Sequence, residues 1–158
     1  MKDDRFLTGI LIGIAVLVVA AVGLFFLRRE AQTYGPESDP AGVARNFVLA
    51  LQKQDYEKAY TYLAEFKDKP SLAQFRRPFV DYQGQDVAGT VLELAEVDSQ
   101  DQEATVSLTL IRGASGPFSS PNREVALARL KQEGGAWKIV EMPYPFWSYE
   151  WIVPVKQP

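Results

Sequence analysis

Ala104-Thr105-Val106-Ser107-Leu108-Thr109-Leu110 is the stretch that decides the fold of this chain, because apolar and hydroxyl side chains alternate along it without a break. Successive side chains of a β-strand point to opposite faces of a sheet, so the alternation predicts a strand with one buried face. Val87–Val97 is strand-like as well, and the polar segment Asp98–Gln102 between them predicts a hairpin loop. The two strands should therefore pair antiparallel.

The sequence after this pair predicts two more strands. A longer loop, Gly113–Pro121, comes first, and a strand is expected around Glu124–Lys131. Gly134-Gly135 then predicts a tight turn into a strand over Trp137–Met142, because two glycines readily adopt the positive φ angles that such hairpins require. The strands together describe an antiparallel meander.

Amphipathic helices should precede the sheet. Asp39 can cap a first helix that opens at Pro40, Asp55 can cap a second, and a third follows Ser71. Helices followed by an antiparallel meander predict an α+β domain with about three helices packed on one sheet face. The apolar residues at helical spacing are Val43, Phe47, Ala50 and Leu51 in the first helix, Tyr56, Ala59, Tyr60 and Leu63 in the second, and Leu72, Phe75, Phe79 and Val80 in the third.

An apolar segment precedes this domain. From Phe6 to Leu27 every residue except Thr8 is apolar or small, and a helix of that length spans about 33 Å, against a hydrocarbon core of about 30 Å. A cleavable signal peptide is the alternative, but its apolar region is usually about 7–15 residues long and leads to small residues. This run ends instead in bulky side chains before Arg28-Arg29, which favours an uncleaved signal-anchor, a single-pass transmembrane helix.

The orientation of the anchor follows less directly from charge. Lys2 and Arg5 flank one end of the apolar run and Arg28 and Arg29 flank the other, so the positive-inside comparison is close to a tie. Few residues precede the helix, which is the arrangement of a signal-anchor whose C-terminal domain is translocated. We therefore expect a cell-membrane protein with an extracytoplasmic domain.

Composition argues against several classes of function. The chain of 158 residues has 17 Lys and Arg against 20 Asp and Glu, which gives no strong positive field for nucleic acid. It has no Cys, the source of thiolate ligands and thiol nucleophiles, and no His, the commonest general base near neutral pH. We expect no cofactor, no metal, no catalytic residue and no enzymatic activity.

Three motifs resemble the NTF2-like superfamily, namely Ala44–Leu51 in an opening helix, Asp55–Tyr60 in a second helix and Gly134–Ile139 at a late strand. The likeness covers about residues 40 to 145 and is greatest to the membrane-anchored or lipid-anchored NTF2-like domains of bacterial envelope proteins. The resemblance implies a curved antiparallel sheet that wraps around helices as a cone, often with a pocket at the open end. Enzymes of that superfamily generally place an Asp with His or Tyr partners there, so without His the resemblance implies a shape and not an active site.

Four residues are candidates for lining such a pocket. Tyr56, Tyr60 and Trp137 either stack on a ligand or pack the core. Arg112 is in phase with the buried positions of its strand, so it could hold an anionic ligand, pair with a carboxylate or reach solvent at the strand end.

Two groups of charged residues are weaker candidates. Asp81-Tyr82 and Asp86 could supply a carboxylate and a phenol at the pocket mouth, or form a solvated loop. A basic cluster could face anionic lipid or, as the alternative, solvent. It consists of Lys67, Lys69, Arg76 and Arg77.

Two features predict contacts with other proteins. Gly9 and Gly13 form a G-x-x-x-G that lets two helix backbones approach closely, although glycine is also simply frequent in membrane helices. The C-terminal segment concentrates large amphipathic rings, which favour a partner interface or a membrane interface, or else a last strand that covers the domain's own core. These rings are Tyr144, Phe146, Trp147, Tyr149 and Trp151.

The expected organisation joins an anchor to one domain. The parts are a tail at 1–5, the transmembrane helix at 6–27, a linker at 28–39, the NTF2-like domain at 40–143 and an aromatic tail or last strand at 144–158. The leading hypothesis is a binding or accessory subunit beside other membrane or envelope proteins, with the lipid bilayer as a further partner. The alternatives are a small-ligand-binding domain and an enzyme that uses a carboxylate in the cone.

Overall fold

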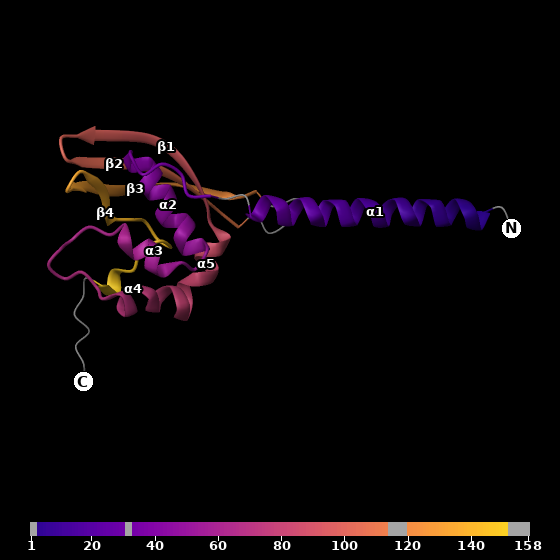
Figure 1. The fold of residues 1–158 in the computed structure, drawn as a ribbon, viewed down its shortest axis with the longest axis horizontal. Helices are drawn as coiled ribbons and strands as arrows, with labels where there is room; N and C mark the ends of the chain where they lie inside the picture. The colour runs from indigo at the N-terminus through magenta and orange to yellow at the C-terminus, as the bar shows by residue number, and fades with distance from the viewer. Residues whose placement is uncertain (1–2, 31–32, 114–119, 152–158) are drawn as a thin grey trace. The chain divides into compact units, whose positions relative to one another are not determined.

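The structure is a computed structural model that describes residues 3–30, 33–113 and 120–151. The chain divides into two compact units, Met1–Tyr34 and Gly35–Pro158. The first unit contains one helix, α1 (Asp3–Glu30), of 28 residues (Figure 1). Its described side chains are those of residues 8–24, and all are exposed. Across the described part of the chain, no helix qualifies as long and apolar enough to cross a membrane.

The second unit begins with the three expected helices, α2 (Pro40–Gln52), α3 (Tyr56–Thr61) and α4 (Leu72–Pro78). Each starts at its predicted cap. The Asp39 carboxylate accepts a hydrogen bond from the Gly42 amide at 2.8 Å, and the Asp55 carboxylate accepts one from the Lys58 amide at 3.1 Å. Ser71 forms a reciprocal capping box with Gln74. The predicted helix starts are confirmed.

The prediction was wrong for the segment that follows α4. A π-helical turn, Phe79–Gln83, and a further helix, α5 (Gly84–Gly89), follow. The sequence indicated the end of the third helix at residues 79–80, then a loop, and a strand from Val87. Pro78 supplies a physical reason, since it has no N–H and so cannot continue the ordinary helical hydrogen bonding. The wider turn shifts the helical phase, so Val80, expected in the core, is exposed.

Four antiparallel strands follow in the order β1-β2-β3-β4. Their bounds are Val91–Gln100 for β1, Glu103–Arg112 for β2, Asn122–Glu133 for β3 and Ala136–Glu141 for β4. The predicted hairpin loop Asp98–Gln102 is shorter than expected, because β1 continues to Gln100 and only Asp101 and Gln102 form the turn. Of the predicted loop Gly113–Pro121, residues 114–119 lie outside the described residues.

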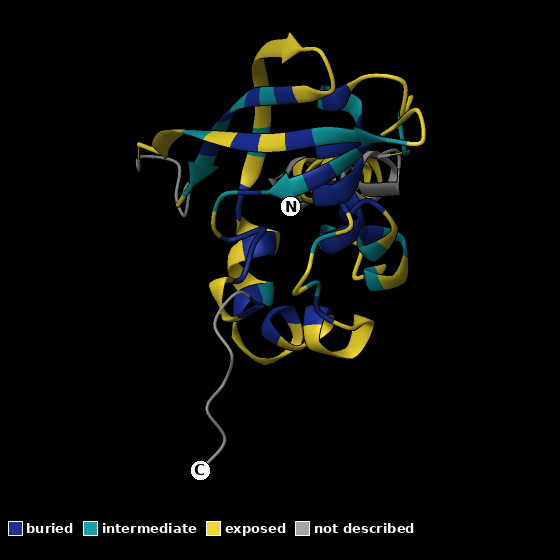
Figure 2. Cartoon of the chain, turned by 90° about the vertical axis from the view of Figure 1, so that its left-hand side faces the viewer, coloured by how far each residue is buried: buried dark blue, intermediate teal, exposed yellow. Residues whose placement is uncertain are grey.

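Both central predictions for the sheet are confirmed. The alternating residues of β2, namely Ala104, Val106, Leu108 and Leu110, are all buried. Gly134 and Gly135 have φ angles of 59° and 83° in the turn between β3 and β4. Figure 2 shows buried segments on the strands and on the helices beneath them. We call the helix-covered face of the sheet the inner face and the opposite one the outer face.

Candidate functional site

The four predicted pocket residues do not line one site. Tyr60 contacts the Phe75 ring edge-on at 5.6 Å and donates its hydroxyl hydrogen bond to the Pro70 carbonyl. Trp137 is buried in β4. Arg112 forms an ion pair with Glu124 at 3.2 Å and donates to the Tyr144 carbonyl, which is the carboxylate-pairing alternative.

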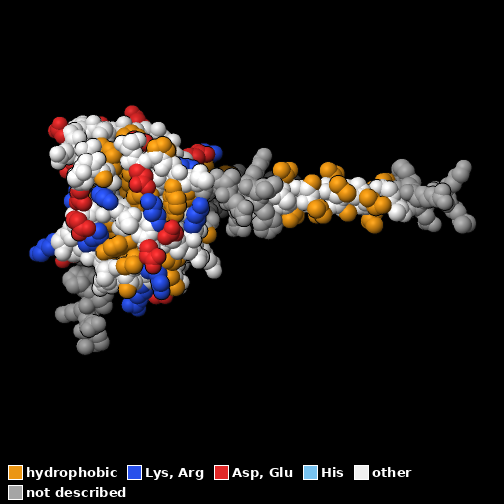
Figure 3. Space-filling model, viewed as in Figure 1, with side chains coloured by type: hydrophobic (Ala, Val, Ile, Leu, Met, Phe, Trp, Pro, Cys, Tyr) orange, Lys and Arg blue, Asp and Glu red, His pale blue; other side chains and the backbone are white. Residues whose placement is uncertain are grey.

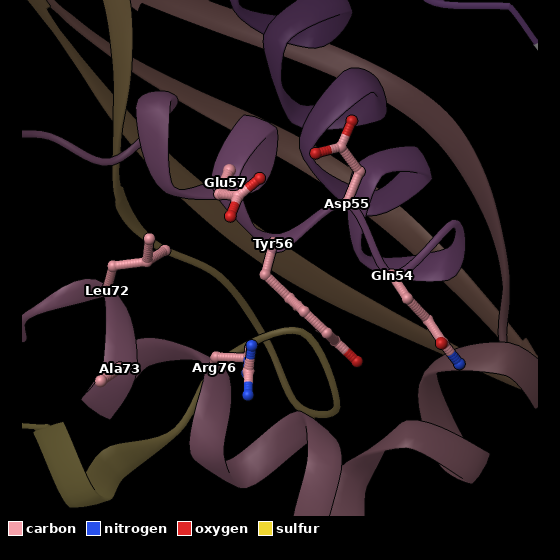
Figure 4. A pocket seen from close by; sticks show the side chains of 7 residues that line it. All are labelled: Gln54, Asp55, Tyr56, Glu57, Leu72, Ala73 and Arg76. Carbon is pink, nitrogen blue, oxygen red and sulfur yellow. The ribbon is translucent and has the colours of Figure 1, made fainter.

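Tyr56 borders a groove between α3 and α4 with a volume of about 590 Å³ (Figure 4). Its ring stacks on Phe79 with centroids 6.1 Å apart. Burial raises the pKa of the Tyr56 hydroxyl, and the positive charge of Arg76 opposes that shift. A second hollow of about 470 Å³ shares Gln54 and Tyr56 with the first. The volumes suit a small molecule, but the walls carry charged side chains of both signs.

The acidic candidates are engaged with other residues. Asp81 lies on the π-helical turn and forms an ion pair with Arg77 at 3.3 Å. Asp86 lies in α5, where its carboxylate accepts a hydrogen bond from the Tyr144 hydroxyl. The short bond to Asp86 also raises the pKa of Tyr144. These residues are therefore part of helices rather than the solvated loop expected from the sequence.

The aromatic C-terminal segment folds back onto its own domain. Trp151 packs against Phe75 at 5.1 Å and Phe79 at 5.9 Å between ring centroids, and against Trp147 at 4.9 Å. We call Phe75, Phe79, Trp147 and Trp151 the aromatic plug. Phe146 is also fully buried. The plug thus packs α4 and the π-helical turn against the described part of the C-terminal segment.

This placement corrects the prediction of an aromatic partner interface. Phe146, Trp147 and Trp151 are core residues, while Tyr144 and Tyr149 are exposed. The alternative that the segment covers the core is thus correct in location. It is wrong in form, because the described segment is a loop followed by a 3-10 helix, Tyr149–Trp151, and not a strand.

A short segment ahead of α2 is bound to the domain. We call Gly35–Glu37 the strap. The side-chain amide of Asn46, fully buried in α2, donates to the Gly35 carbonyl at 2.9 Å and accepts from the Gly35 amide at 2.8 Å. A Cβ atom on Gly42 would lie 2.2 Å from the Pro36 carbonyl oxygen, so only glycine lets the strap approach so closely. Part of the expected linker is therefore held by the domain.

The end of the strap is fixed by charge. The Glu37 carboxylate accepts a hydrogen bond from the Tyr62 hydroxyl at 2.7 Å and from the Lys58 ammonium at 3.1 Å. The bonds from Tyr62 and Lys58 lower the pKa of Glu37, and burial together with the bond to Glu37 raises the pKa of Tyr62 to about 12. The sequence patterns did not predict this group of contacts; the available signal was the polar Asn46 within the apolar stripe of α2.

The remaining candidate residues are two glycines of α1 and the basic cluster. Gly9 and Gly13 lie in α1, and a Cβ on either would meet no described atom within 4 Å. Two members of the basic cluster are paired, Lys69 with Glu65 at 2.6 Å and Arg77 with Asp81. Among the described residues, no group of three or more His, Cys, Asp or Glu could hold a metal ion.

Comparison with known proteins reveals similarity in structure alone. Neither a protein-family profile nor a curated sequence matches the chain. A SEC-C motif-containing protein from Rhodopseudomonas palustris is similar with a TM-score of 0.47 and 11% identity, over 68% of this chain and 79% of that one. A cystatin-like-fold protein of unknown function from Nostoc punctiforme has a TM-score of 0.42 and 18% identity, over 62% and 80%. An uncharacterised cystatin-fold protein from Novosphingobium aromaticivorans has a TM-score of 0.38 and 12% identity, over 68% and 100%.

Proposed function

We propose that this protein is a membrane-tethered, non-enzymatic NTF2-like domain that serves as a binding or accessory subunit of a membrane or envelope protein complex. In this proposal the lipid bilayer holds the N-terminal helix, and the α+β domain lies on the extracytoplasmic side of the cell membrane. The family assignment rests on the motifs Ala44–Leu51, Asp55–Tyr60 and Gly134–Ile139, together with the arrangement of helices on one face of a four-stranded antiparallel sheet.

The observation that carries the proposal is the apolar surface of α1. Its large side chains from Ile10 to Leu24 are exposed, and Figure 3 shows those on one face of the helix. They include the consecutive residues 10–12 and 16–19, which at 3.6 residues per turn face every side of the helix. A helix that is apolar on every side requires a bilayer or a protein around it, because exposure of its whole apolar surface to water is unfavourable in free energy. In the sequence the apolar run Phe6–Leu27 extends past both ends of the described side chains.

Three properties of the domain support a binding role over catalysis. The rings of the aromatic plug pack against one another and are buried, so they leave less room for a ligand in that part of the domain. Asp81 and Asp86, the carboxylates proposed for the pocket mouth, already have partners. On the outer face, Val125 and Leu127 lie two residues apart on β3 and are both exposed, and exposed apolar surface favours association.

Membrane fractionation and topology mapping test the anchor. We expect the full chain to stay in the pellet after alkaline carbonate extraction of native membranes. Of two reporters fused at the C-terminus, we expect activity from one that functions only outside the cytoplasm and none from one that functions only inside it. Release of the chain into the carbonate supernatant would refute the tether, and activity of a cytoplasm-specific reporter would refute the orientation.

A further inference from the structure

Strand β1 forms an open edge of the sheet. The strand order β1-β2-β3-β4 places it at one end, where it pairs with β2 alone among the described strands. It has ten residues, of which only Leu92 is not exposed. An edge strand presents N–H and C=O groups that a further strand can pair with, so proteins usually shorten or cover such edges. In the described structure β1 is neither short nor covered.

The inner side of β1 is apolar. Leu92, Leu94 and Val97 lie opposite buried residues of β2, so their side chains belong to the helix-covered face. Leu94 and Val97 are nevertheless 38% and 42% exposed. An additional strand beside β1 would let apolar side chains of its own pack against these two residues.

The outer side of β1 is acidic. Glu93 and Asp98 pair with Thr109 and Thr105, which alternate with the buried residues of β2 and therefore lie on the outer face. Glu96 is in the bulge between Leu94 and Val97. Glu93 is neutralised by Arg123 at 3.1 Å, whereas the ion pairs among the described residues include neither Glu96 nor Asp98. No Lys or Arg occurs in the strand.

We infer that the open edge of β1 binds an extended segment of a partner protein in which apolar and basic residues alternate. Added as a strand, such a segment would place its apolar side chains beside Leu94 and Val97 and its Lys or Arg side chains beside Glu96 and Asp98. The inference rests on the proposed function and specifies the chemistry of the subunit's partner.

The charge of β1 decides between this occupant and a second copy of the chain. Two β1 strands side by side would bring the acidic outer sides together, and like charges on neighbouring strands are destabilising. A basic segment gains from the same charges. The bulge divides the strand into the paired portions Val91–Leu94 and Val97–Gln100, so the partner segment is expected to pair on both sides of the bulge and to bend at Glu96.

A peptide titration of the full chain in detergent tests this inference. The probe is a peptide of about six residues, a typical strand length, that alternates lysine and valine and is blocked at both ends. We expect saturable binding that weakens with added salt, and slower amide exchange over Val91–Gln100 in the complex. A peptide of the same composition with its lysines and valines in separate blocks should bind more weakly, because it cannot present one apolar and one basic side.

Charge reversal provides the matched comparison. Glu96→Lys with Asp98→Lys should weaken binding of the alternating peptide about tenfold, since two cross-strand attractions become repulsions. Glu57→Lys with Asp68→Lys changes the net charge equally at exposed positions away from β1 and should leave binding within about twofold of the original. Equal weakening by both pairs, unchanged exchange in β1, or equal binding of the blocked peptide would overturn the inference.

The same variants separate this inference from the proposed function. If a partner co-purifies with the wild-type chain and with the Glu57→Lys/Asp68→Lys control but not with the Glu96→Lys/Asp98→Lys chain, the β1 edge is its binding site. If the partner is retained by all three, the β1 inference fails while the subunit proposal stands. If the wild-type chain has no partner, the proposed function itself fails.

Discussion

Replacement of Asn46 by alanine should detach the strap and lower the stability of the domain. Asn46 is fully buried and makes two hydrogen bonds to Gly35, at 2.8 and 2.9 Å. Each bond contributes about 1 kcal/mol net, and alanine regains about 0.5 kcal/mol as the better helix former. Gly35 lies near the start of the domain, so its amide and carbonyl can bond to water once they lose Asn46. We therefore add no penalty for buried polar groups left without a partner. The expected loss is about 1.5 kcal/mol.

Urea unfolding of the full chain in detergent, followed by tryptophan fluorescence, measures this loss. All three tryptophans lie in the domain and are buried, so their emission reports its unfolding. Under native conditions, amide hydrogen exchange at Gly35 should be faster in Asn46→Ala than in the wild-type chain. If the substitution instead loosened α2 in general, exchange would also become faster along α2. Glu57→Ala, an exposed change in a neighbouring helix, is the control and should alter stability by less than about 0.5 kcal/mol. A loss no larger than that control, with unchanged exchange at Gly35, would refute the strap's role.

Further predictions concern the plug, the hairpin and the strap's charge. Trp147→Ala should cost about 3–5 kcal/mol of unfolding free energy, as expected for a large buried ring, while Tyr149→Ala, 58% exposed, should stay within about 0.5 kcal/mol; equal effects in urea unfolding would contradict the plug. Gly134→Ala should lose about 1 kcal/mol, because φ is 59° there, and an unchanged unfolding midpoint would argue against that turn. The stabilisation from Glu37 is present above its ordinary pKa of 4.5 and is lost as pH falls through the lower pKa of the folded state. Amide exchange at the strap should therefore accelerate in acid, and Glu37→Gln should abolish this pH dependence; a variant that retains it would count against Glu37.

Local patterns predicted most of the regular structure. Strand β2 followed from its alternation because one face packs on helices and the other meets solvent. The helix starts at Asp39, Asp55 and Ser71 followed from side chains that satisfy free N–H groups. The turn at Gly134-Gly135 followed from backbone freedom. Each of these depends on neighbours within a few residues in the chain.

The predictions were wrong where packing between residues far apart in the chain decides the structure. The change from a helical to an alternating pattern after Gly84 predicts a strand from Val87, yet the π-helical turn after Pro78 continues into α5 and Val87 is buried there. The site was predicted less well than the fold. Ring-rich sequence does not distinguish an interface from a core, and Trp147 and Trp151 are buried only because the chain returns to Phe75 and Phe79. The strap depends on Asn46, whose partner is 11 residues away.

Gentle solubilisation of native membranes, followed by affinity capture of the full chain, tests whether this protein is a subunit of a complex. We expect to recover the chain in a complex heavier than its own 17.7 kDa, with at least one other membrane or envelope protein present in constant proportion through size separation. Recovery of the chain only as a free monomer, with no protein in constant proportion, would contradict its role as a subunit.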